Sequence, residues 1–115
     1  MQHDPLTIEE VTSSSTGTRV LRLTGPIMLS NLFDFQAKVR ANTSRALILD
    51  MSGVPYVDSA GIGAMVGAYV THNKDNRSLA LVGVNDRVLG TLSMTRVDGF
   101  FKRYDSVAAA EAATG

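Results

Sequence analysis

The sequence predicts an α/β domain with a mixed sheet of four to five strands and with helices packed mainly on one side. Apolar runs typical of strands alternate with helical patterns after an opening hairpin, which favours a sheet that is partly antiparallel and partly parallel. Residues 46–51, ALILDM, form the continuous apolar run of a strand buried on both faces. The length of 115 residues suits a single domain over residues 1–115, with a core from about residue 6 to 113.

The first two strands are predicted from apolar residues at 6–11 and at 20–23, the second ending at Gly25-Pro26. Between them, TSSSTGT has the composition of a solvated hairpin turn. Helical spacing from Leu29 to Arg40 predicts the first helix, with Ser30 or Asn31 able to cap its start. The buried strand at 46–51 follows.

A second helix is predicted from apolar residues at i, i+3, i+4, i+7 and i+8, which are Ile62, Met65, Val66, Tyr69 and Val70. The polar segment HNKDNRS ends this helix. A strand at 78–84, a short helix capped by Asn85 and ending near Met94, and an edge strand at 99–101 come next. An alanine-rich helix capped by Asp105 or Ser106 closes the chain. The expected core comprises Leu47, Ile48, Leu49, Ile62, Met65, Val66 and Leu81.

Charge and composition argue against several classes of function. Eleven basic residues balance eleven acidic residues without a basic cluster, so we expect binding neither to nucleic acid nor to a membrane surface. The absence of cysteine excludes disulfides and thiol chemistry. The polar opening MQHDPLTIEE is unlike a secretory signal, and no apolar run is long enough to span a bilayer, so we expect a cytoplasmic protein.

The stretch YVDSAGIGAMV, residues 56–66, fits neither of two enzyme motifs. A GxGxxG phosphate loop needs a glycine at 66, whereas Gly61 and Gly63 are followed by Gly67. A hydrolase turn needs glycine two residues before the serine, where Val57 stands, and only His3 and His72 are candidate bases. We therefore expect no catalytic residue and no enzymatic activity.

A capping role explains part of this stretch, because Asp58 or Ser59 can accept a hydrogen bond from a free helix N–H. It does not explain Gly61 and Gly63, each of which costs up to about 1 kcal/mol relative to alanine in a helix. The small residues Ala60, Gly63, Ala64, Gly67 and Ala68 leave one helix face almost bare. Another backbone can pack against that face, either from within the fold or from a partner.

Three segments of the chain resemble the STAS domain of anti-sigma factor antagonists. LILDMSGVPYVDSAGIGAMV is similar to the family's strand, Asp-Leu-Ser-Gly, connector and Asp-Ser-Ser-Gly-hydrophobe-Gly helix start. LRLTGPI resembles an early strand end, and LSMTRVDGFFKRYDSVAAAEAA resembles the closing segment. There are two departures: Ala60 replaces a frequent second serine, and PIMLSNLFDFQ lacks the usual Leu-Asp-x-x-x-Ala stretch.

The resemblance implies a phosphorylation site at Ser59 and a partner-binding surface formed by Asp58, Ser59, Ala60, Gly61, Ile62 and Gly63. The implied partner is an anti-sigma factor with GHKL-type serine/threonine kinase activity, which binds the ATP and Mg²⁺ itself, so this chain needs no cofactor or metal. Phosphorylation would release the partner and thereby regulate sigma-factor-dependent transcription. The alternative is a constitutive STAS subunit of a lipid-transport or stressosome-like assembly without phosphorylation. The sequence does not predict the oligomeric state.

Overall fold

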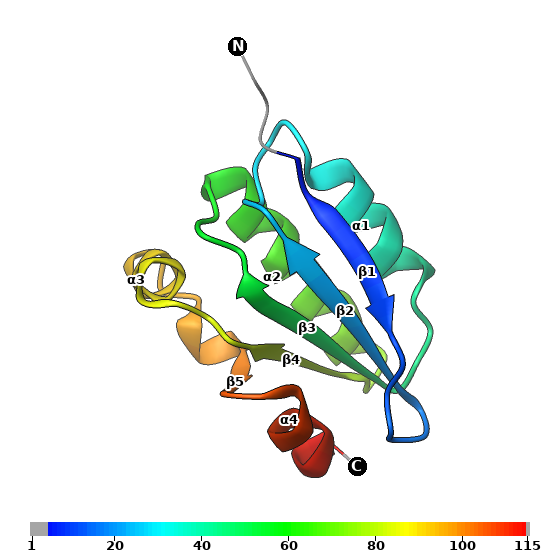
Figure 1. Cartoon of the computed structure of the whole chain (residues 1–115). Coiled ribbons are helices and arrows are strands. Elements are labelled where there is room, and N and C mark those ends of the chain that lie inside the picture. The colour runs from blue at the N-terminus through cyan, green and yellow to red at the C-terminus, as the bar shows by residue number, and fades with distance from the viewer. Residues whose placement is uncertain (1–4, 115) are drawn as a thin grey trace.

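The computed structural model, which describes residues 5–114, has one five-stranded sheet in the order β1-β2-β3-β4-β5 (Figure 1). The strands are β1 (Thr7–Val11), β2 (Thr18–Thr24), β3 (Ala46–Gly53), β4 (Ser78–Val82) and β5 (Lys102–Tyr104). β1 runs antiparallel to β2, and the other neighbours are parallel. This arrangement confirms the mixed sheet and its opening hairpin.

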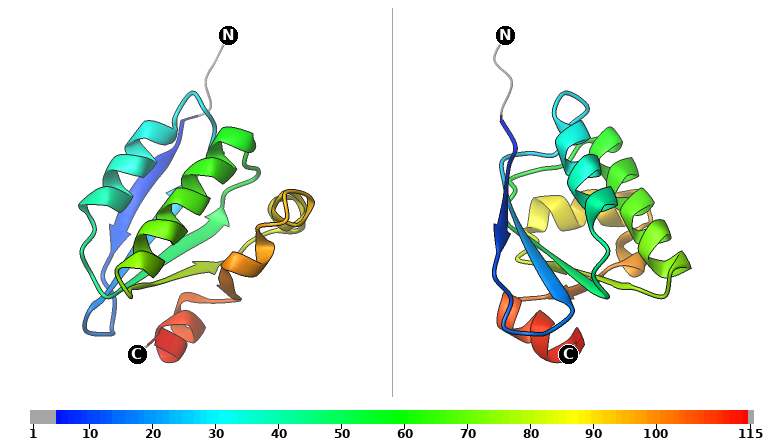
Figure 2. Two further views of the ribbon diagram at one scale, coloured as in Figure 1. Left: turned by 180° about the vertical axis from the view of Figure 1, so that it is seen from behind. Right: turned by 90° about the vertical axis from the view of Figure 1, so that its right-hand side faces the viewer.

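The helices are α1 (Leu32–Ala41), α2 (Ser59–Lys74), α3 (Asp86–Met94) and α4 (Val107–Thr114), with a 3₁₀ turn η1 (Asp98–Phe100) before β5. α1 and α2 lie side by side on one face of the sheet, whereas α4 lies against the other face (Figure 2). Residues of α3 join the core on the α1–α2 face. The predicted placement of most helices on one side is therefore confirmed.

The large core lies between the sheet and α1, α2 and α3, and the predicted core residues Leu47, Leu49 and Leu81 are 0–1% exposed. Ile48 belongs to a smaller cluster beneath α4. Ile62 and Met65 are buried as predicted, but Val66 is only partly buried.

The apolar stripe predicted for α2 is therefore partly wrong. Val70 is 54% exposed, while the small residues Ala64 and Ala68 are buried. Small side chains let α1 approach α2 closely, so this side of the helix faces the core and Val70 faces solvent.

The predicted edge strand at 99–101 is displaced along the chain. Residues 98–100 form η1, and β5 begins at Lys102. Phe100 stacks on Tyr69 of α2 with ring centroids 5.2 Å apart, and Phe101 meets the same ring edge-on at 5.9 Å. Both phenylalanines thus pack against one tyrosine. The chain forms a tight turn here, where the sequence favours an extended strand.

Candidate functional site

Residues 58–63 lie where β3 leads into α2, at the carboxyl end of the parallel strands. The connector after β3 is fastened to the segment that follows β2 by the bridge between Ile27 and Val57. The Asp58 N–H donates to the Ile27 carbonyl at 3.1 Å, and the Ile27 N–H donates to the Tyr56 carbonyl at 3.2 Å. Open α/β sheets commonly meet ligands and partners at this edge.

The carboxylate of Asp58 joins two segments of the chain. Asp58 is the N-cap of α2, and its Oδ1 accepts a hydrogen bond from the Gly61 N–H at 2.8 Å. Its Oδ2 accepts from the Leu29 N–H at 3.1 Å, in the loop before α1. Of the two predicted cap residues, Asp58 forms the cap, and it also fixes the neighbouring loop.

Ser59, the first residue of α2, is exposed. Its hydroxyl has no hydrogen-bond partner among residues 5–114. By contrast, Ser52 donates its hydroxyl to Asp50 Oδ1 at 2.7 Å, and Ser13 donates to Glu111 Oε2 at 2.5 Å. Ser59 therefore presents a free hydroxyl at the positive end of a helix dipole.

The two glycines at the start of α2 have different surroundings. A Cβ added to Gly61 would lie 2.4 Å from the Ile27 carbonyl oxygen and 2.6 Å from Val57 Cγ1, so the fold itself requires glycine there. A Cβ on Gly63 would meet no atom within 4 Å. Packing within the fold explains Gly61 and leaves the helix-propensity cost of Gly63 unexplained.

The six residues predicted to bind a partner therefore differ in accessibility. Ser59 and Gly63 are exposed, Asp58 and Ala60 are partly buried, and Gly61 and Ile62 are buried. The outward-facing members lie on one side of α2, because residues 59 and 63 are four positions apart. Their role in binding stays a prediction.

Two large apolar side chains in and just before α1 are exposed and were not among the predicted site residues. Leu29 is 64% exposed and Phe33 is 68% exposed, and the Leu29 backbone is the one bound by Asp58. The helical spacing at 29–40 suggests a buried role for both, so their exposure could not be predicted from the sequence.

The start of α3 is hydrogen-bonded to the other side of the connector between β3 and α2. Asn85 caps α3 through a 2.8 Å bond from the Val88 N–H, and its Nδ2 donates to the Val54 and Pro55 carbonyls at 3.2 Å each. The Arg87 guanidinium lies 4.7 Å from the centre of the Tyr56 ring. The connector before Ser59 is therefore held from both sides.

The structure brings no histidine to Ser59 within the part of the chain that it describes. His72 lies near the other end of α2, roughly 20 Å along the helix axis. Burial lowers the pKa of its imidazole. His3 lies outside the described residues. Across residues 5–114 there is no metal-binding cluster of histidine and acidic side chains, and no helix is long and apolar enough to cross a membrane.

Comparison with known proteins agrees with the fold. A family model described as the STAS domain matches residues 10–110. An anti-sigma-B factor antagonist of Staphylococcus aureus is 32% identical over 50 residues, which is 44% of this chain and 46% of that protein. The matched region thus spans about half the length of this curated relative.

Solved structures show the same fold at low identity. A putative anti-sigma factor antagonist from Thermotoga maritima has a TM-score of 0.84 at 22% identity, covering 93% of each chain. The phosphorylated form of SpoIIAA from Bacillus has a TM-score of 0.71 at 14% identity, covering 93% of this chain and 99% of that one. The family model covers most of the chain, residues 10–110, and therefore shows that the chain belongs to the STAS domain family.

Proposed function

We propose that this protein is an anti-sigma factor antagonist that binds an anti-sigma factor with GHKL-type serine/threonine kinase activity. Phosphorylation of Ser59 by that partner dissociates the complex and thereby regulates sigma-factor-dependent transcription in the cytoplasm. The functional unit is the single domain 1–115. The observation that carries the proposal is the free hydroxyl of Ser59, exposed at the start of α2 on a connector held by Asp58 and Asn85.

Phosphate at this position is compatible with the fold. A helix amino end carries about half a positive charge and has unsatisfied N–H groups, which attract an anion. Asp58 lies next in sequence, but each of its two oxygens accepts a hydrogen bond from a backbone N–H. These bonds hold the carboxylate in place, so we expect the helix start to keep its conformation on phosphorylation.

The same phosphate opposes docking. It adds about −1.5 to −2 charges at pH 7. A partner that covers Ser59 also approaches the exposed side chain of Leu29, because Asp58 holds that loop. Burying the charge together with apolar surface would require its desolvation, which weakens the complex.

The partner supplies the catalytic chemistry. A bond forms between Ser59 Oγ and the γ-phosphorus of ATP as the bond to the bridging oxygen breaks, and ADP leaves. The hydroxyl proton passes to a base of the partner or to water. This chain contributes only the acceptor. The proposal is supported by SpoIIAA, a protein of similar fold that has been solved in a phosphorylated form.

The test uses the purified chain, Mg·ATP and each purified anti-sigma factor with a kinase domain from the same genome. We expect one of them to bind the chain in calorimetry, to phosphorylate Ser59 as located by mass spectrometry, and to bind the phosphorylated chain at least tenfold more weakly. Stable binding to a lipid-transport ATPase or to a stressosome-like assembly, without phosphorylation and without binding to any anti-sigma factor, would replace this function with that of a constitutive subunit.

A further inference from the structure

Helix α2 carries a second outward-facing glycine that the fold does not require. A Cβ on Gly67 would meet no atom within 4 Å, as at Gly63, and both residues are exposed. Glycine weakens a helix relative to alanine, and nothing within the described part of the chain compensates. Contact with another chain, whose backbone would come close, accounts for glycine at both positions.

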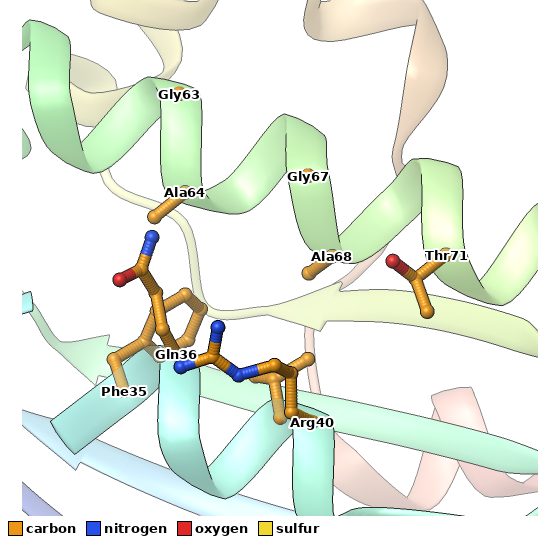
Figure 3. Close-up of a pocket in the computed structure, with 9 residues that line it drawn as sticks. Phe35, Gln36, Arg40, Gly63, Ala64, Gly67, Ala68 and Thr71 are labelled. Atoms are coloured by element: carbon orange, nitrogen blue, oxygen red, sulfur yellow. The ribbon is translucent and has the colours of Figure 1, made fainter. Parts of the chain in front are cut away.

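These glycines open a groove of about 200 Å³ between α1 and α2 (Figure 3). Phe35, Val39, Ala64 and Ala68 are buried and form its apolar floor. Gln36 and Arg40 extend from α1 across this floor, and Thr71 lies at the far end (Figure 3). Two neighbouring helices with a shallow apolar seam offer the surface into which a third helix packs.

The positive charge of Arg40 in the groove favours an occupant with an acidic side chain. Arg40 is exposed, and its guanidinium has no ion pair or hydrogen bond to any residue between 5 and 114. No carboxylate is among the nine lining residues. A carboxylate on the incoming helix would complement this cation, and arginine can bind it through two parallel hydrogen bonds.

The groove is continuous with the proposed docking surface. Ser59, Gly63 and Gly67 follow one another at four-residue spacing and so lie along one side of α2. A partner that covers Ser59 therefore reaches the groove within one to two helical turns.

We propose that this groove receives an α-helix of the anti-sigma factor, with small or apolar residues against Gly63 and Gly67 and an acidic residue paired with Arg40. The inference rests on the proposed function and adds a second contact, which anchors the partner away from Ser59. Affinity then depends on α1 as well as on the start of α2.

The first test substitutes the exposed glycines by alanine. Gly67→Ala should raise the melting temperature by roughly 3 °C, because alanine favours the helix, yet it should weaken binding of the purified anti-sigma factor at least threefold. Gly67→Leu should weaken it more than tenfold. Gly90→Ala is the matched control, because Gly90 is also exposed within a helix and has open space around it. The control should gain stability without losing affinity.

The second test reverses charge. Arg40→Glu should weaken binding at least tenfold, whereas Lys38→Glu should leave it within twofold, because Lys38 faces Leu6 and Ile8 on the other side of α1. If Ser59→Glu weakens binding while Gly67→Leu and Arg40→Glu bind like wild type, the groove is not used and the proposed function stands. If no anti-sigma factor binds the wild-type chain, both the function and the groove contact are wrong.

Discussion

The two ends of helix α2 differ in the exposure and hydrogen bonding of their polar side chains. At the start, Ser59 is exposed, and its hydroxyl has no hydrogen-bond partner within residues 5–114. Near the end, His72 is 1% exposed and both ring nitrogens are engaged. Nδ1 donates to the Ala68 carbonyl at 2.8 Å, and Nε2 accepts from Asn42 Nδ2 at 3.2 Å.

Around His72 the hydrogen bonds continue from one element to the next. Asn42 Oδ1 accepts from the Ser44 hydroxyl at 2.6 Å, and Arg77 donates to the Asn42 carbonyl at 2.7 Å. This network joins the ends of α1 and α2 to the segments that lead into β3 and β4. The polar groups around His72 are therefore hydrogen-bonded within the fold, whereas the hydroxyl of Ser59 is not.

The largest effect is expected at the buried end. His72→Ala leaves a cavity and removes the acceptor for the Asn42 amide, so it should lower the free energy of unfolding by about 2–4 kcal/mol. Urea unfolding measures this loss. Asn73→Ala is the control, because Asn73 is exposed in the same last turn, and it should change stability by less than about 0.5 kcal/mol. Equal effects at both positions would contradict the structural role of His72.

The pH dependence of stability sharpens the same contrast. Burial lowers the pKa of His72 below its usual 6.5, with Arg77 acting in the same direction and the Ala68 carbonyl and Asp75 opposing. As the pH falls, His72 therefore binds a proton in the unfolded chain at a higher pH than in the folded chain. The contribution of neutral His72 to the free energy of unfolding should be fully present above pH 6.5. It should fall as the pH drops below 6.5, by at most about 1.4 kcal/mol per pH unit. The His72→Ala protein should lack this component between pH 5 and 8, and an identical pH profile in both proteins would contradict the assignment.

A smaller loss of stability is expected from Asp58→Asn. This substitution removes one of the two hydrogen bonds that the carboxylate accepts and keeps the other. The amide oxygen can still cap α2, but the NH₂ group cannot accept from the Leu29 N–H. Stability should fall by about 1 kcal/mol, the typical value of one hydrogen bond. Amide exchange at Leu29 should accelerate while exchange at Gly61 stays slow, and equal acceleration at both would show that the two bonds are not separable.

Some of this architecture could be predicted from the sequence because local chemistry determines it. The run at 46–51 and the caps Asp58 and Asn85 fall where predicted. The buried face of α2 could not be predicted fully, because its small residues and its large residues each form a helical stripe. Close packing against α1 selects Ala64 and Ala68, and this contact is not encoded locally.

The site shows the same division. Ser59 is predicted as a site residue from the resemblance to the STAS motif, whereas the hydrogen bond from the Leu29 N–H to Asp58 joins residues that are distant in sequence. His72 lies in the polar segment HNKDNRS, so its burial could not be predicted from the sequence. Long-range contacts determine both features.

The smallest change in stability is expected for Ser59→Ala. The cap is Asp58, so the hydroxyl of Ser59 contributes little to the fold, and stability should stay within about 0.5 kcal/mol of wild type. Phosphate transfer by the partner should disappear, as followed by mass spectrometry. Phosphate that appears instead at Ser52 or in the Ser13–Ser15 loop of the wild-type chain, with Ser59 unmodified, would place the switch elsewhere.

We propose that Ser59, at the start of α2, controls binding without supporting the fold, whereas Asp58 and Gly61 beside it support the fold. The direct measurement compares chain phosphorylated at Ser59 with unmodified chain, recording both the melting temperature and the affinity for the purified anti-sigma factor by calorimetry. We expect the melting temperatures to agree within about 3 °C, because the helix amino end tolerates an anion, and the affinity to fall at least tenfold. Equal affinities would contradict the switch, and a phosphorylated chain that unfolds would show that the unmodified side chain of Ser59 is needed for the fold.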